Sequence, residues 1–120
     1  MYKVFFYKKR NGESPVADYI EGLRKENSKD SRINYKKILT CLNLLKEKGL
    51  GLGMPYIRRI EDDIWEIRVN KNRILFFPYD DGFVLLHWFN KRTKKTPESE
   101  KINARKEKKN YILGGGNNEE

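Results

Sequence analysis

The chain is poor in cysteine and histidine, and it has no long hydrophobic run. It contains one cysteine, Cys41, and one histidine, His87, among 120 residues. A single cysteine excludes an internal disulfide and is typical of a reducing compartment, so we expect a cytoplasmic protein. No stretch approaches the ~20 apolar residues that span a bilayer, and the apolar run at the N-terminus is too short for a secretory signal.

Acidic residues are the minority among the charged side chains. The sequence has 26 Lys and Arg against 17 Asp and Glu, which gives a formal net charge of +9. Two-thirds of this excess lies in residues 87–109, where nine basic residues face three acidic ones. Such a balance implies attraction to a polyanion, which can be nucleic acid, an anionic membrane surface or an acidic protein.

The chain has enough apolar residues for one modest core. Hydrophobic residues make up 38% and aromatic residues 12%, which suits one domain of ordinary size. We expect residues 1–113 to form this single domain. The glycine-rich and polar residues 114–120 are predicted to be a flexible tail.

Hydrophobic periodicity predicts an α+β fold. Apolar residues recur at helical spacing in the first half of the chain, and strand-like runs separated by short turns fill the second half. Ser14 and Pro15 begin the first helix, Asp30 or Ser31 is expected to cap the second, and Gly49 to end it. The predicted order is an N-terminal strand (2–8), a helical hairpin (15–26 and about 31–48), a curved antiparallel sheet (56–60, 64–69, 73–79, 83–89) and a C-terminal helix that begins after Thr96-Pro97.

The turns between the strands fix which side chains share a face. We expect Lys71-Asn72 to be a two-residue turn, and residues 80–82 to be a three-residue turn with Gly82 in the left-handed region. One face of the sheet is then apolar and packs against helices. It carries Trp65, Ile67, Val69, Ile74, Phe76, Val84, Leu86 and Trp88. The other face brings Arg68, Arg73, His87 and Lys91 together at one end, beside Glu66.

This group of side chains suits the handling of a phosphodiester. Arginine binds phosphate oxygens with a rigid fork, and histidine moves protons near neutral pH. RNA supplies its own nucleophile in the 2′-OH, so a cleaving protein needs only a base, an acid and cations around the transition state. We therefore expect RNA cleavage without a metal or other cofactor. The acids at 61–63 and 80–81 lie in turns, where acidic residues are routine.

Each of these residues also has a plain structural interpretation. Arg68 and Arg73 fit solvent-facing strand positions, with Glu66 paired to Arg68. His87 fits a packed strand histidine. The basic run at 91–95 fits a solvated loop. Trp65 and Trp88 are expected in the core, and Cys41 is expected to be a small buried hydrophobic residue in the second helix.

Two segments together resemble the RelE/ParE toxin superfamily, in its phage-derived, HigB-like branch. They are WEIRVNKNRILFF (65–77) and FVLLHWFNKRTKKTP (83–97), and a charged helix follows them. The resemblance implies a toxin of a type II toxin–antitoxin system, an endoribonuclease that cuts mRNA in the ribosomal A site. It also implies a partner antitoxin with a helix-turn-helix domain, and no membrane partner. An alternative within the superfamily is a ParE-type toxin that blocks DNA gyrase without enzymatic activity.

The resemblance also assigns roles to individual residues. It implies catalytic roles for Arg68, Arg73, His87 and Lys91, with the proton donor open between the last two. Arg92, Lys94 and Lys95 would bind mRNA or rRNA. Tyr111 is a candidate for the aromatic residue that some relatives stack on RNA.

Overall fold

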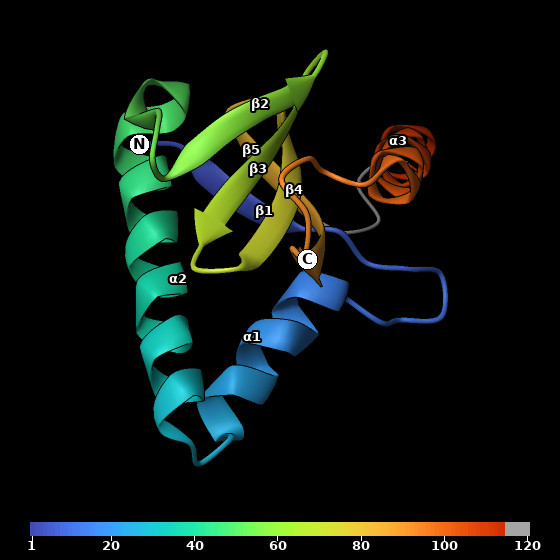
Figure 1. The fold of residues 1–120 in the computed structure, drawn as a ribbon. Helices are drawn as coiled ribbons and strands as arrows, with labels where there is room; N and C mark the ends of the chain where they lie inside the picture. Colours follow the sequence, from blue (N-terminus) through green and yellow to red (C-terminus); the bar gives the residue numbers. More distant parts are fainter. Residues whose placement is uncertain (115–120) are drawn as a thin grey trace.

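The computed structural model describes residues 1–114 as three layers (Figure 1). Helices α1 (Pro15–Lys25) and α2 (Lys29–Lys48) cover one face of a five-stranded sheet, and α3 (Glu98–Leu113) lies on the opposite face. A short 3₁₀ helix, η1 (Gly49–Leu52), follows α2. The strands are β1 (Lys3–Phe6), β2 (Ile57–Glu61), β3 (Ile64–Val69), β4 (Asn72–Tyr79) and β5 (Gly82–Asn90). The predicted α+β fold is thus confirmed. Apart from Gly114, the predicted tail lies outside the described residues.

The sheet has the order β1-β5-β4-β3-β2. Strands β2 to β5 are antiparallel neighbours, as predicted, whereas β1 pairs with β5 in parallel. Gly82 makes that parallel pairing possible, because a Cβ atom there would lie only 2.2 Å from the carbonyl oxygen of Lys3. The glycine is therefore needed for close approach of two backbones.

Both predicted hairpin turns differ from the observed ones by one residue: the β3–β4 turn is displaced, and the β4–β5 turn is shorter. Asp80-Asp81 forms a two-residue turn with Asp80 at φ 54°, so Gly82 already belongs to β5, opposite Tyr79. The prediction of a three-residue turn with Gly82 in the left-handed region was therefore wrong, since Gly82 does not have a positive φ. Asn70, at φ 54°, and Lys71 form the other turn, so Arg68 lies opposite Arg73. Asparagine and aspartate tolerate this left-handed backbone better than most residues. Each residue of β3 therefore pairs with a β4 residue two positions away from its predicted partner. Because side chains two apart share a face, every side chain in this pair stays on its predicted face.

A bulge in β5 changes the predicted faces of that strand. Phe76 pairs with Leu85, but Leu75 pairs with His87, so Leu86 is the extra residue. Phe83 and Leu85 therefore pack against the helical hairpin. Val84 and Leu86 pack on the α3 side instead of the predicted apolar face.

The sheet consequently has a core on each side. The core under α1 and α2 includes Val16, Ile38, Cys41, Leu42, Leu45, Ile67, Ile74 and Phe76, and the core under α3 includes Leu75, Phe77, Ala104 and Tyr111.

Three smaller predictions have mixed outcomes. Ser28 caps α2, because its hydroxyl oxygen accepts the backbone N–H of Ser31 at 3.1 Å. The prediction of Asp30 or Ser31 as the cap was therefore wrong. Trp88 is 37% exposed and stacks on Tyr19 with ring centroids 3.9 Å apart, so it lies at the margin of the core. Within residues 1–114, no helix combines the length and the apolar character that spanning a bilayer requires.

Candidate functional site

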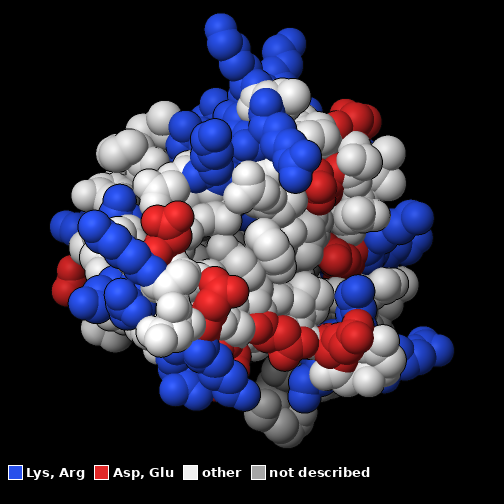
Figure 2. Space-filling model, turned by 60° about the horizontal axis from the view of Figure 1, so that its bottom comes forward, with Lys and Arg blue, Asp and Glu red and all other residues white. Residues whose placement is uncertain are grey.

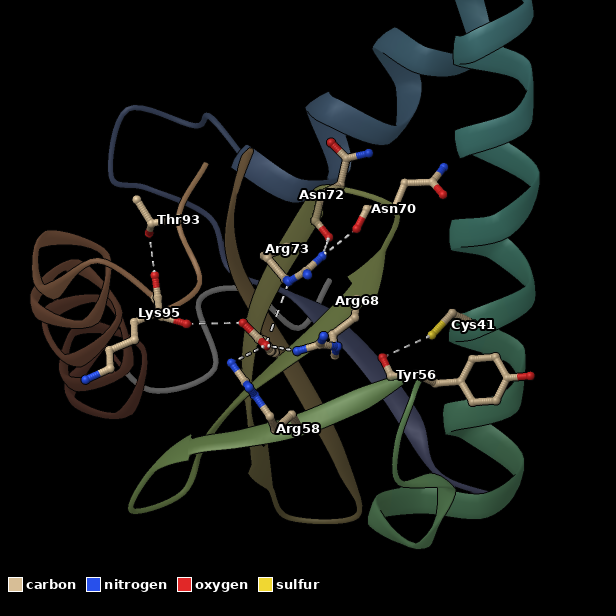
Figure 3. A network of polar contacts seen from close by, with 11 residues as sticks. Cys41, Tyr56, Arg58, Arg68, Asn70, Asn72, Arg73, Thr93 and Lys95 are labelled. Carbon is tan, nitrogen blue, oxygen red and sulfur yellow. Dashed lines mark hydrogen bonds and ion pairs between the residues drawn. The ribbon is translucent and has the colours of Figure 1, made fainter. Parts of the chain in front are cut away.

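A buried carboxylate on β3 gathers three arginines from three neighbouring strands. Glu66 is fully buried, and its Oε2 lies 3.2 Å from Arg58 Nη2, 2.9 Å from Arg68 Nη1 and 3.8 Å from Arg73 Nε. Figure 3 shows these three arginines, from β2, β3 and β4, pointing toward one another. The other carboxylate oxygen accepts the Thr96 hydroxyl at 3.3 Å. We call these three arginines and Glu66 the arginine cluster.

The strand register builds this cluster directly. Arg58 lies opposite Glu66 across the β2–β3 pair, and Arg73 lies opposite Arg68 across the β3–β4 pair. Glu66 and Arg68 are two residues apart on β3. Side chains two apart on a strand share a face, and cross-strand partners face the same way. The four side chains therefore meet on the face that carries α3.

The arginine cluster holds more positive charge than its carboxylate neutralises. Three guanidinium groups surround one carboxylate, and Lys91 adds a fourth cation from the end of β5. The backbone N–H of Lys91 donates to the carbonyl of Lys71 at 2.7 Å, which fixes its position beside the β3–β4 turn. Burial and the positive charge of Arg73 lower the pKa of Lys91 below its ordinary value. An anion is thus attracted to this end of the sheet.

Arg73 is the least exposed of the three arginines, at 6%. Its Nη1 donates to the carbonyls of Asn70 and Asn72, at 2.8 and 3.0 Å. Its Nε is buried without a hydrogen-bond partner in the described part of the chain. Burial lowers the pKa of Arg73, while the charge of Glu66 opposes that shift. Glu66 Oε2 lies 3.8 Å from Arg73 Nε, too far for a hydrogen bond, and a buried donor left unpaired costs about 1–3 kcal/mol.

A groove of about 490 Å³ opens beside Arg68 and Arg73. Its wall on α2 carries Lys36 and Lys37, and Tyr56 lies just before β2. Its charged lining residues are all basic: Lys36, Lys37, Arg68 and Arg73. Thr40, Cys41, Pro55, Val69 and Asn70 complete the lining. We call it the cationic groove.

A second groove, of about 260 Å³, adjoins the arginine cluster at Arg58. Arg58 belongs to the arginine cluster and also lines this groove. The other lining residues are Arg59, Ile60, Lys94, Lys95, Thr96 and Lys101. Lys94 and Lys95, predicted to bind RNA, thus lie next to the cluster, whereas Arg92 is exposed and lines neither groove. Figure 2 shows from one side that basic side chains gather in separate clusters, with a band of acidic side chains in the lower half and others near the upper right edge.

His87 is held by α3. Its Nε2 lies 2.8 Å from Glu100 Oε1, and its Nδ1 lies 2.5 Å from Glu107 Oε1. Burial alone would lower the pKa of His87, but hydrogen bonds and charges from Glu107 and Glu100 outweigh it and raise the pKa. Both ring nitrogens face carboxylate oxygens, which favours the protonated ring, because only that form donates from both nitrogens. Of the four residues predicted to be catalytic, Arg68, Arg73 and Lys91 come together, and His87 ties α3 to the sheet.

Residues 22–109 match the family described as "Phage derived protein Gp49-like (DUF891)". The chain belongs to this family. Gp49-like proteins are related to the RelE and HigB toxins, which supports the coarser part of the resemblance in the sequence. The matched segment includes the arginine cluster, both grooves and His87. No curated protein sequence matches this chain.

The acidic residues of this Gp49-like protein are dispersed. Among residues 1–114, no group of three or more His, Cys, Asp or Glu side chains could hold a metal ion. Three of the turn acids pair with basic side chains instead: Glu61 with Arg105 at 3.0 Å, Asp63 with Lys108 at 2.5 Å, and Asp81 with Lys3 at 3.5 Å.

Sequence reasoning missed part of the site of this Gp49-like protein. Arg58, Lys36, Lys37 and Tyr56 were not predicted as site residues. The adjacent lysines on α2 were the available signal, since both are exposed and lie outside the buried Ile38–Leu42–Leu45 stripe. Nothing in the sequence placed these lysines beside the β3–β4 turn.

Proposed function

We propose that this Gp49-like protein is a type II toxin that cleaves mRNA on the ribosome, and that it needs no metal for the reaction. The arginine cluster carries the proposal, because it places three guanidiniums and Lys91 around one buried carboxylate, beside a groove with a wholly basic charged lining. The family's relation to RelE and HigB toxins supports the toxin role. Its site of action would be the cytoplasm, and a helix-turn-helix antitoxin would be its partner.

The reaction would use the 2′-OH of the RNA as nucleophile. The 2′-oxygen attacks the adjacent phosphorus and loses its proton to water, and the bond from phosphorus to the 5′-oxygen breaks. The products are a 2′,3′-cyclic phosphate and a 5′-hydroxyl end. Arg73 and Arg68 would bind the nonbridging oxygens and stabilise the charge that develops on them.

Lys91 is our proposed proton donor to the leaving 5′-oxygen. Its lowered pKa brings it closer to the pH at which an acid gives up its proton readily. His87, the other candidate, would first have to release Glu100 or Glu107. We therefore assign His87 to holding α3 in place. Lys94 and Lys95, together with Arg92, would bind RNA backbone next to the cluster.

The test is to add the purified protein to translating ribosomes and map the ends of the mRNA. We expect cuts that leave 2′,3′-cyclic phosphate ends, and no cut where the nucleotide at the cleavage site carries 2′-deoxyribose. A DNA gyrase supercoiling assay runs in parallel and should show no inhibition. Intact mRNA together with blocked supercoiling would instead support the ParE-type alternative.

A further inference from the structure

Arg68 and Arg73 line only part of the cationic groove, and the other half is lined by other residues. Lys36 and Lys37 on α2 line one side of it, and Tyr56 lies beside them. We propose that this half binds one unpaired nucleotide of the RNA next to the scissile phosphate, with its base stacked on Tyr56 and its own phosphate held by Lys36 and Lys37. This inference rests on the proposed function and names the positioning residues for its substrate.

Tyr56 combines a fixed backbone with an exposed ring. Its carbonyl accepts the N–H of Arg68 at 2.8 Å, and its own N–H donates to the carbonyl of Gly53 at 3.1 Å. These bonds fix the residue next to Arg68 (Figure 3). Its side chain is nevertheless 42% exposed, and within residues 1–114 its ring pairs with no other aromatic ring. An exposed aromatic ring beside a basic groove is the arrangement on which single-stranded nucleic acids stack their bases.

The α2 side of the groove is also fixed, and it is basic. Lys37 Nζ lies 3.4 Å from Asn70 Oδ1, and the Asn70 amide donates to Asn34 Oδ1 at 2.8 Å. These contacts tie α2 to the β3–β4 turn and so set the width of the groove. Neither Lys36 nor Lys37 pairs with an acidic side chain in the described part of the chain. Both ammonium groups are thus available to an anion.

The dimensions and chemistry of the groove suit a single nucleotide. A volume of about 490 Å³ falls within the usual 300–1,000 Å³ of small-ligand sites. Arg68 and Arg73 also line the groove, so their guanidinium groups mark the place for the scissile phosphate. Thr40 and Asn70 lie in the lining as hydrogen-bonding groups for a base edge. A base can reach them only when it is unpaired, so the site selects single-stranded RNA.

The experiment measures binding without cleavage. A fluorescent five-nucleotide RNA with 2′-O-methyl groups, which cannot be cut, is titrated with protein at several salt concentrations. Tyr56→Ala should raise Kd about 5- to 150-fold, which is what loss of one stacked base amounts to. Tyr56→Phe should bind like the wild type. The Tyr56→Ala variant should also keep the wild-type slope of log K against log salt.

The role of the two lysines is tested by the slope of log K against log salt. Lys36→Ala combined with Lys37→Ala should reduce that slope by about 0.7 for each RNA phosphate that the two lysines neutralise in the wild type. Lys8→Ala combined with Lys9→Ala is the matched control, since it removes the same charge outside the groove and should leave the slope nearly unchanged. Circular dichroism and thermal melting establish that each variant is folded.

Three results would overturn the inference: no binding by the wild type, wild-type affinity of Tyr56→Ala, or equal slopes for the two lysine pairs. The proposed function is judged separately by cleavage on ribosomes. If the wild type and Tyr56→Ala cleave mRNA alike while binding is unaffected, only the inference fails. If RNA binds through Tyr56 but is never cut, the proposed function fails and the nucleotide site remains.

Discussion

Glu66 is the residue whose replacement tests the arginine cluster most severely. Glu66→Gln keeps the size of the side chain but removes the only negative charge among Arg58, Arg68 and Arg73. Breaking a buried ion pair by removing one partner costs about 3–5 kcal/mol, because the other charge stays buried. Arg58 and Arg68 are partly exposed and can turn toward solvent, whereas Arg73 cannot. We therefore expect the free energy of unfolding to fall by about 3 kcal/mol, the low end of that range.

Urea unfolding followed by circular dichroism measures this loss. Glu21→Gln is the matched control, because Glu21 contacts Arg24 on the surface of α1, and it should unfold like the wild type. Adding Arg73→Met to Glu66→Gln should restore part of the lost stability, since the double variant no longer buries an uncompensated guanidinium. If Glu66→Gln unfolds at the wild-type urea concentration, the carboxylate does not hold the arginines and the reasoning is wrong.

Three further predictions concern the rest of the fold. The raised pKa of His87 means that its stabilising effect is complete below about pH 6.5, its ordinary pKa, and is lost as the pH rises through the folded-state value. Urea unfolding at a series of pH values should thus show the free energy of unfolding falling above about pH 6.5. His87→Gln should make this pH dependence flatter, and an unchanged pH dependence would contradict the role of His87 in holding α3. Burial raises the pKa of the Cys41 thiol to about 11. A disulfide reagent at pH 8 should therefore label Cys41 slowly in the folded protein and at once in urea. Rapid labelling of the folded protein would show that the thiol is accessible. Gly82→Ala would press a methyl group against the Lys3 carbonyl, and it should lower the free energy of unfolding, measured by thermal unfolding, by about 1–3 kcal/mol. Gly51→Ala is the control and should lower it less, because the space around a Cβ atom there is open. Equal losses of stability would mean that β1 can move aside.

The face of each residue in the β3–β4 hairpin was predictable because strand parity tolerates a two-residue change of partner. Arg68 and Arg73 were placed together correctly even though the turn was assigned one residue too late. In β5 the same parity failed, because the bulge at Leu86 has no local signature in an apolar run. Val84 and Leu86 were consequently assigned to the wrong face.

The interactions of His87 depended on a long-range contact that sequence patterns do not reveal. Glu100 and Glu107 are seven residues apart on α3, so they lie on the same side of the helix, two turns apart. That spacing was visible in the sequence, but the docking of α3 over β5 was not. The same limit applies to Lys36 and Lys37, whose role in the cationic groove depends on how α2 packs against the sheet.

The rate at which Arg73 variants cleave ribosome-bound mRNA tests the proposed function most directly. Arg73→Ala should cut about 10²–10³-fold more slowly than the wild type, the usual effect of removing one transition-state donor. Arg73→Lys should also be slow, since lysine keeps the charge but lacks the planar fork. Arg24→Ala, a surface change on α1, should cut at the normal rate. Wild-type cleavage by a folded Arg73→Ala protein would contradict the assignment of the arginine cluster as the site of RNA cleavage.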